Sequence, residues 1–187
     1  MIVNALTHRP GGILNVIETP VEIKNPFNGN VVKTLAIWDT GATSCAITEK
    51  LAQQLSLPII AKGRVLGVHG EREVNVHDVE IKLNNENIQL RTRVSACSEL
   101  SSDGSIGLLL GMDVITKGDF FITNHNGNTV MTFRVPSLET KDFCEEIKEY
   151  NRFSKIHDIQ RKKGITKCPC GSGKDFKNCH GKSIYNQ

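Results

Sequence analysis

From about residue 13 to residue 135, the chain consists of short apolar runs separated by turn residues. Apolar and β-branched residues recur over a few positions at a time, with Gly, Pro and Asn between the runs. This pattern is typical of strands joined by tight turns. It predicts strands at 13–23, 31–38, 64–68, 73–83, 88–95, 106–110, 120–123 and 129–135. Turn clusters at 25–30 and 124–128 predict hairpins, and a short helix at 48–55 would be capped by Thr48.

The pattern changes after Pro136. Residues 137–163 contain no Gly or Pro, and Phe143, Ile147 and Tyr150 recur at helical spacing. We therefore expect one long amphipathic helix. The expected N-cap is Ser137 or Thr140, and the expected end is Gly164. Residues 165–187 are too few for a hydrophobic core and need a staple, so the expected division is 1–136, 137–164 and 165–187.

Composition excludes several classes of protein. The 187 residues are 39% hydrophobic and 23% charged, which excludes collagen-like and wholly disordered chains. No apolar run is long enough for a membrane helix, and the first 12 residues lack the apolar stretch of a signal peptide, so a cytoplasmic location is expected. The net charge of +3 is uneven: residues 1–137 hold 12 Lys/Arg and 13 Asp/Glu, whereas residues 138–187 hold 11 and 7. The basic second part is either a solvated helix or a surface for an acidic partner.

An apolar segment at 35–38 continues directly into the acidic motif Asp-Thr-Gly-Ala-Thr-Ser at 39–44. A buried strand brings its last residue to a fixed point at the edge of a core, where a carboxylate must be paired or hydrogen-bonded. Thr40 offers a hydroxyl, and Gly41 lets another backbone approach closely. The motif suits an acid–base carboxylate at Asp39, although an Asx turn after a strand would use the same residues.

Two further segments accompany this motif. Residues 65–70, Val-Leu-Gly-Val-His-Gly, predict a hairpin tip that could act as a flap, and residues 108–113, Leu-Leu-Leu-Gly-Met-Asp, predict an apolar strand ending in Gly. Together the three motifs resemble those of the retropepsin-like aspartic proteases over roughly residues 15–135. The resemblance implies a mainly β protein with a closed β-barrel of the acid-protease type, followed here by the long helix and the small stapled module.

The resemblance also implies roles for individual residues. Asp39, Thr40 and Gly41 would be catalytic, with Thr40 bracing a dimer through hydrogen bonds between two such loops. Substrate contacts are implied for Ala42, Gly67, Val68, His69, Gly70, Leu110 and Gly111, of which the last two also support the catalytic loop. His69 departs from the glycine-rich flaps of viral members, and an exposed histidine without a role is the alternative. Cys45 lacks a partner His in any interpretable motif and is expected to be a small buried residue.

Aspartic protease chemistry needs two carboxylates. Two close like charges share one proton, so that one carboxylate acts as a base on water and the other as an acid on the carbonyl. The chain offers one qualifying motif, because Asp103-Gly104-Ser105 follows a polar segment and is typical of a turn. We therefore expect a homodimer in which each chain contributes one Asp39.

A cluster near the C-terminus predicts a metal site. Cys168, Cys170, Cys179 and His180 lie within 13 residues, with glycines that allow tight turns. Three thiolates and an imidazole suit tetrahedral Zn²⁺, and metal binding would supply the stability that this short segment lacks. The segment is similar to the SEC-C zinc motif. The similarity implies these four residues as ligands of one structural Zn²⁺ per chain, with no cofactor for catalysis, and a docking module for a protein or ribosome partner.

The leading hypothesis is a cytoplasmic, bacterial, homodimeric aspartic endopeptidase that acts on a peptide or protein substrate and carries a zinc module for docking. The alternative is a non-proteolytic adaptor that uses the barrel and the zinc module for protein, ribosome or nucleic-acid interaction. Nucleic-acid binding would depend on the basic second part alone, without interleaved aromatic residues. No membrane partner is expected.

Overall fold

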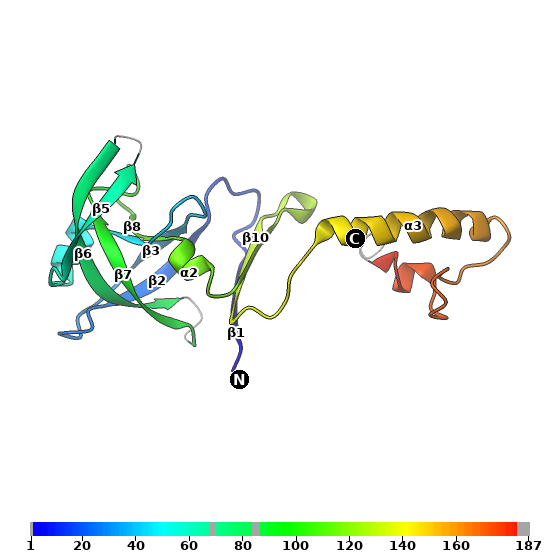
Figure 1. Ribbon diagram of the computed structural model, residues 1–187, viewed down its shortest axis with the longest axis horizontal. Helices are drawn as coiled ribbons and strands as arrows, with labels where there is room; N and C mark the ends of the chain where they lie inside the picture. Colours follow the sequence, from blue (N-terminus) through cyan, green and yellow to red (C-terminus); the bar gives the residue numbers. More distant parts are fainter. Residues whose placement is uncertain (1, 68–69, 84–86, 183–187) are drawn as a thin grey trace. The chain divides into compact units, whose positions relative to one another are not determined.

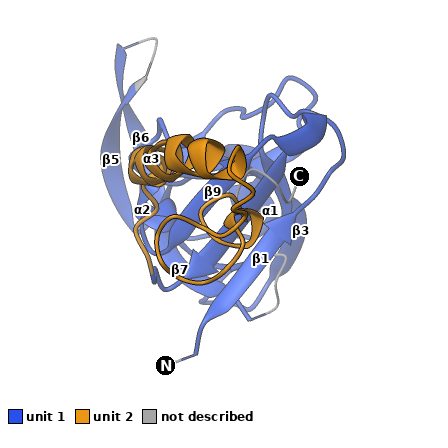
Figure 2. Ribbon diagram, turned by 90° about the vertical axis from the view of Figure 1, so that its right-hand side faces the viewer, with its two compact units in different colours: residues 1–138 blue, residues 139–187 orange. Residues whose placement is uncertain are grey.

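The computed structural model describes residues 2–67, 70–83 and 87–182. The chain divides into two compact units, Met1–Leu138 and Glu139–Gln187, which Figure 2 distinguishes by colour. Within the described residues, no helix combines the length and the apolar character needed to cross a membrane. Each unit is considered by itself below.

The first unit is mainly β. Its described strands are β1 (Asn4–His8), β2 (Glu18–Lys24), β3 (Val31–Trp38), β4 (Ala46–Thr48), β5 (Ala61–Gly67), β6 (Gly70–Leu83), β7 (Gln89–Cys97), β8 (Ile106–Leu110), β9 (Asp119–Thr123) and β10 (Val130–Val135). Its helical segments are α1 (Glu49–Gln54), α2 (Met112–Ile115) and the 3-10 turn η1 (His125–Gly127). Thr48 caps α1 as predicted, because its side chain accepts a hydrogen bond from the Leu51 backbone N–H.

Six strands close into a barrel. The large sheet has the order β2-β3-β8-β4-β7-β6-β5, and a second pairing between β2 and β6 closes the ring (Figure 1). The predicted hairpin of β2 and β3 is confirmed. The second half of β6 alternates as a half-buried strand should, with Val79, Ile81 and Leu83 buried. The mainly β fold class with a closed barrel, followed by a helix and a Cys₃His segment, is therefore confirmed.

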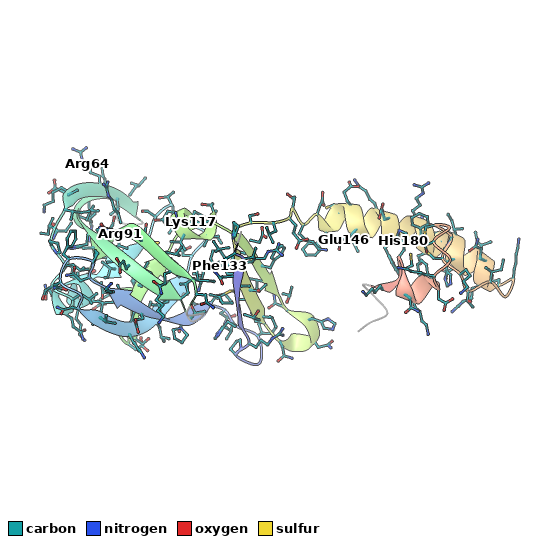
Figure 3. The ribbon with its side chains drawn as sticks, turned by 90° about the horizontal axis from the view of Figure 1, so that it is seen from below. Arg64, Arg91, Lys117, Phe133, Glu146 and His180 are labelled. Atoms are coloured by element: carbon teal, nitrogen blue, oxygen red, sulfur yellow. The ribbon has the colours of Figure 1, made fainter. Side chains whose placement is uncertain are left out.

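A small sheet packs against one part of the barrel. β10 lies between β1 and β9, and both pairings are antiparallel. Phe133 on β10 and Phe120 on β9 contact Trp38 at the end of β3, with ring centroids 5.1 and 5.3 Å from the Trp38 ring. Phe133 is labelled in Figure 3. The Trp38 indole N–H donates to Thr19 Oγ1 at 2.9 Å, which satisfies its buried polar group. This aromatic cluster fixes the C-terminal end of β3.

The second unit consists of the helix α3 (Phe143–Arg161) and a loop segment with the 3-10 turn η2 (Phe176–Asn178). Asp142 caps α3 by accepting hydrogen bonds from the backbone N–H groups of Cys144 and Glu145. The main chain doubles back at an isolated bridge between Lys167 and Asp175. Phe176 is buried in this segment.

The structure departs from the sequence prediction at several elements, and two departures have a visible cause. The strand predicted at 13–23 begins only at Glu18, because the backbone N–H groups of Gly12 and Leu14 donate to the side chains of Asn128 and Thr129 instead of to a strand. Strand β1 was not predicted. The helix predicted from residue 137 begins at Phe143 and is capped by neither Ser137 nor Thr140, because Ser137 Oγ and the Leu138 N–H donate to the Asp119 carboxylate.

Candidate active site and metal centre

The barrel holds Asp39 at a fixed point. Strand β8 is inserted between β3 and β4, and it runs parallel to β3 with Trp38 opposite Leu110. The Asp39 N–H continues this pairing by donating to the Leu110 carbonyl at 3.0 Å. The backbone that enters Asp39 is therefore fixed by the barrel and not by the loop alone.

The Asp39 carboxylate is half-buried and is oriented by its own loop. Its Oδ1 accepts a hydrogen bond from the Gly41 N–H at 2.8 Å, and the Asp39 carbonyl accepts one from the Ala42 N–H at 3.3 Å. From the sequence, this segment was either an Asx turn or the site of a functional carboxylate. The structure shows the turn, made by Oδ1, while Oδ2 has no protein partner among the described residues. Thr40 and Gly41 are exposed beside it.

The loop after Asp39, residues 40–44, crosses the end of β8 at Gly111. The Ala42 and Thr43 carbonyls accept hydrogen bonds from the N–H groups of Met112 and Asp113 at 2.8 and 3.2 Å. A Cβ at Gly111 would lie 2.6 Å from the Ser44 carbonyl oxygen, so only glycine fits at this crossing. Leu110 and Gly111 thus lie directly beside the Asp39 loop.

A buried polar network behind this loop was missed by the sequence prediction. The Cys45 thiol, which is fully buried as predicted, donates to Asp113 Oδ1 at 3.0 Å and accepts from the Gly111 N–H at 3.4 Å. Thr92 on β7 donates to Asp113 Oδ2 at 3.3 Å. Burial, together with the hydrogen bond to Asp113, raises the pKa of Cys45 to about 12. No local sequence signal joins Thr92 to residues 45 and 113, because β-sheet pairing brings them together.

The predicted flap corresponds to the hairpin of β5 and β6. Gly67 pairs with Gly70 across its tip, whereas the predicted contacts Val68 and His69 lie outside the described residues. Leu66 is 84% exposed, and the ion pair of Arg64 with Glu71 spans the hairpin at 3.8 Å (Figure 3).

The Asp103 carboxylate is hydrogen-bonded within its own turn. It is exposed in a bend, and its Oδ1 accepts hydrogen bonds from Ser101 Oγ, the Ser105 N–H and Ser105 Oγ. These hydrogen bonds, first that of the Ser105 N–H, lower the pKa of Asp103 to about 2. The sequence interpretation of this segment as a turn is confirmed.

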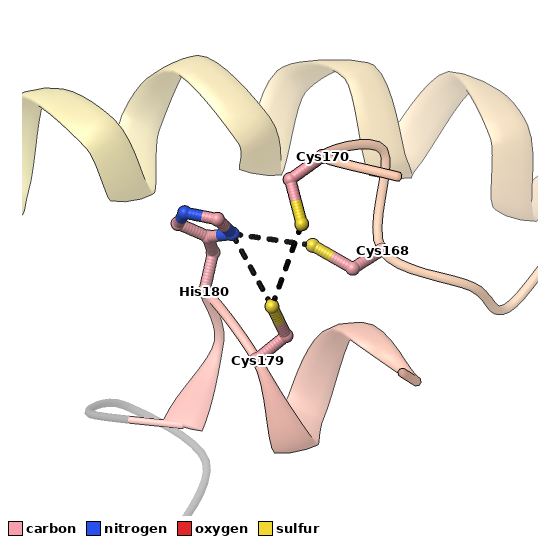
Figure 4. Close-up of side chains that lie close together, drawn as sticks. All are labelled: Cys168, Cys170, Cys179 and His180. Atoms are coloured by element: carbon pink, nitrogen blue, oxygen red, sulfur yellow. Dashed lines mark hydrogen bonds between the residues drawn. The ribbon is translucent and has the colours of Figure 1, made fainter. Parts of the chain in front are cut away.

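Four side chains converge near the C-terminus. The thiol sulphurs of Cys168, Cys170 and Cys179 and a ring nitrogen of His180 all lie within 4.8 Å of one another (Figure 4). Cys168 Sγ is 3.3 Å from His180 Nδ1, and Cys170 Sγ is 3.6 Å from Cys179 Sγ. Ligands on a tetrahedron with bonds of about 2.0–2.3 Å are separated by roughly 3.5–3.8 Å, so the four residues fit a metal site.

The thiols of this cluster have unequal surroundings. Hydrogen bonds with Ser172 lower the pKa of Cys170 to about 6, whereas burial raises the pKa of Cys168. A thiolate is the form that binds metal, and the lowered pKa of Cys170 favours that form near neutral pH. The donor set and spacing therefore favour a borderline-soft cation over a hard one.

Comparison with known protein families finds a match for the barrel and a match for the Cys₃His segment. The aspartyl protease family model matches residues 19–114, and the SEC-C motif model matches residues 166–182. A comparison with curated protein sequences finds no match.

Similar solved structures share low sequence identity with the chain. A retropepsin-like aspartic protease from Rickettsia conorii has 14% identity and a TM-score of 0.42, over 72% of this chain and 94% of that one. The EIAV protease, complexed with an inhibitor, has 21% identity and a TM-score of 0.38, over 54% and 86%. The retroviral protease-like domain of Ddi1 from Leishmania major has 19% identity and a TM-score of 0.40, over 70% and 100%.

The match to the aspartyl protease model spans more than half of the chain and includes the Asp39 loop, β8 and Gly111. The chain therefore belongs to the aspartyl protease family in its retropepsin-like form, and it carries a SEC-C motif at residues 166–182.

Proposed function

We propose that the chain is an aspartic endopeptidase that hydrolyses peptide bonds as a homodimer. The observation that carries this proposal is the position of Asp39, whose backbone is fixed by β3 and β8 while Oδ2 has no protein partner in the described part of the chain. A carboxylate held in this way is preorganised to meet a second carboxylate and a water molecule. Asp103 is bound in its own turn, so the second carboxylate is Asp39 of another copy.

The two Asp39 carboxylates share one proton because two adjacent negative charges repel each other. The ionised carboxylate takes a proton from water as the water oxygen attacks the peptide carbonyl carbon. The protonated carboxylate donates its proton to the carbonyl oxygen, which gives a tetrahedral intermediate with two hydroxyl groups. The first carboxylate then passes its new proton to the amide nitrogen as the C–N bond breaks, while the second takes a hydroxyl proton from the intermediate, which leaves as the acid. Thr40, exposed beside Asp39, is suited to hydrogen-bond the facing loop of the partner copy.

The surrounding loops would hold the substrate. Gly41 and Ala42 present exposed or half-exposed backbone beside the carboxylate, and the hairpin that contains Gly67 and Gly70 would cover an extended peptide. Leu110 and Gly111 act by supporting the Asp39 loop. The roles proposed for Val68 and His69 at the tip rest on the sequence resemblance.

Digestion of a peptide library at several pH values tests the proposal. We expect cleavage by the wild-type chain and none by Asp39→Asn, whose side chain has nearly the same shape but cannot exchange the proton. Asp103→Asn is the matched control and should cleave like wild type. Cleavage that persists in Asp39→Asn would contradict the proposal. If the wild-type chain binds peptides but cleaves none of them, and Asp39→Asn binds the same peptides, the adaptor function is favoured.

We further propose that Cys168, Cys170, Cys179 and His180 hold one structural Zn²⁺ and that this module docks a protein partner. All four positions of a tetrahedral ion would be filled by protein, which leaves no site for a reacting water. The purified chain should contain one equivalent of zinc by elemental mass spectrometry, and Cys179→Ser should lose it while Cys144→Ser keeps it. An equal zinc content in both variants would overturn the assignment.

A further inference from the structure

The imidazole of His180 presents its two nitrogens to different surroundings. Nδ1 faces the sulphur atoms, 3.3 Å from Cys168 Sγ and 3.5 Å from Cys179 Sγ (Figure 4). Nε2 lies 3.8 Å from Glu149 Oε2, a carboxylate on α3. A metal-binding nitrogen is an acceptor without a proton, so the other nitrogen must carry the N–H and needs an acceptor of its own.

Helix α3 also packs against the ring of His180. The Phe153 ring centroid is 4.1 Å from that of His180. One turn further along α3, His157 stacks on Phe176 at 4.3 Å with an interplanar angle of 12°. Phe176 lies between the two pairs of candidate ligands in the sequence and is buried, so α3 provides the surface against which the ligand-bearing segment folds.

Two other carboxylates of this helix have partners. Glu145 accepts a hydrogen bond from Lys148, and Glu146 accepts one from Lys141. Among the described residues, Glu149 lies beside His180. Its side chain is long and 68% exposed, so a rotation that shortens the separation by about 1 Å would give a normal hydrogen bond.

We propose that Glu149 is a positioning residue of the metal site, accepting a hydrogen bond from His180 Nε2–H, and that α3 is consequently part of this site. The inference rests on the proposed metal site. The hydrogen bond holds His180 in the tautomer whose Nδ1 lone pair points at the metal, and the Phe153 ring restricts the rotation of the imidazole.

The stability of α3 depends on the same contacts. A helix of 19 residues is marginally stable in water unless it packs against something. Phe143, Ile147, Ile156 and Ile159 are exposed, whereas Tyr150, Phe153 and His157 of α3 contact the rings of Phe176 and His180 within the second unit. Metal binding, by ordering His180 and Phe176, therefore stabilises α3.

Metal titration of the full-length chain tests this inference. Co²⁺ is added to the metal-stripped protein and followed by its absorption bands, and Zn²⁺ affinity is then obtained by competition. Glu149→Ala should weaken Zn²⁺ binding by roughly 10–100-fold, and Glu149→Gln, which keeps an acceptor oxygen, should weaken it less. Glu145→Ala, which removes a neighbouring carboxylate paired with Lys148, should bind like wild type.

A second pair of variants tests the aromatic contact. Phe153→Ala should weaken metal binding, whereas Ile156→Ala, which removes an exposed apolar side chain of the same helix, should not. Hydrogen exchange of the backbone amides at 143–161 should slow on addition of Zn²⁺ to the wild-type chain.

The outcomes are distinguishable. If the wild-type chain binds no Co²⁺ or Zn²⁺, the proposed metal site itself is wrong. If the wild-type chain binds metal and both Glu149 variants bind it with the wild-type affinity, the positioning role of Glu149 is wrong. If exchange at 143–161 is the same with and without Zn²⁺, the coupling of α3 to the metal is wrong.

Discussion

At the scale of single residues, the Asp39 site depends on small groups that allow close approach. Gly111 lies where two loops cross, and Cys45 fills the space behind them with one thiol that both donates and accepts. Cys45 is fully buried and does not reach the surface of the site. Gly111 and Cys45 determine where the Asp39 carboxylate lies, so their substitution should affect stability and activity together.

Gly111→Ala should destabilise the first unit by about 1–3 kcal/mol, because its Cβ would meet the Ser44 carbonyl oxygen at 2.6 Å and the Ala42 carbonyl oxygen at 3.0 Å. Urea unfolding followed by the fluorescence of Trp38, the single tryptophan, measures the change. Gly12→Ala is the control: it has a positive φ of 73° but open space around a Cβ, so it reports backbone strain without a clash. Equal losses in the two variants would contradict the close-crossing argument.

Cys45 should be chemically inert in the folded chain. Its thiol is buried with a pKa of about 12, so it carries almost no thiolate at pH 8. Alkylation by iodoacetamide, mapped by mass spectrometry of peptides, should modify the exposed Cys144 and leave Cys45 intact until urea is added. Modification of Cys45 at the rate of Cys144 in native protein would show that the network around it opens readily.

At the scale of elements, one carboxylate links the two neighbouring strands β9 and β10 to the chain that follows them. Asp119 begins β9 and accepts hydrogen bonds from Ser137 Oγ at 2.5 Å and from the Leu138 N–H at 2.9 Å. The Arg134 guanidinium on the paired strand β10 contacts the same carboxylate. This network fixes the chain directly after β10 and explains why residues 137 and 138 do not begin the helix.

Stability of the first unit should fall in acid through Asp119. The hydrogen bond of Ser137, together with those of Leu138 and Arg134, lowers the pKa of Asp119 from 3.8 to about 2. A carboxyl group whose pKa is lower in the folded state stabilises that state above its unfolded pKa, and the contribution is lost as the pH falls from about 4 to about 2. Above this range, the wild-type chain should unfold at a higher urea concentration than Asp119→Asn, as measured by Trp38 fluorescence. This difference between the two urea midpoints should therefore become smaller as the pH falls over that range. Asp158→Asn on α3 should show no such gap at any pH.

At the scale of the whole molecule, the chain supplies one placed carboxylate and the proposed chemistry needs two. The barrel is closed within one chain, whereas the active site would be completed only between two copies. The second unit adds a proposed metal module, whose folding depends on a ligand rather than on a large core.

Mixing experiments should reveal the shared site. If each active dimer needs two Asp39 residues, equal amounts of wild-type and Asp39→Asn chains, after exchange, should leave about a quarter of the dimers with both. Peptidase activity per dimer should then fall to that fraction. An equal amount of Asp103→Asn in place of Asp39→Asn should leave activity unchanged. A fall to one half only would indicate that each chain acts alone.

The sequence by itself determined the local features of this protein. Alternating apolar residues defined most strands, Thr48 defined the start of α1, and the spacing of three cysteines and a histidine defined the metal cluster. These signals are readable because each depends on residues close together in the chain. The acidic motif at 39–44 and the strand ending at Gly111 were recognised separately for the same reason.

Only the tertiary structure decided how these parts meet. The insertion of β8 between β3 and β4 brings Gly111 against Ser44 and joins Cys45 to Asp113 and Thr92. The Asp119 network, formed across paired strands, moved the start of α3 to Phe143, and the contact of Glu149 with His180 depends on how the ligand segment folds back on the helix. Such contacts join residues far apart in sequence, and their partners are selected by strand pairing and packing rather than by any local pattern.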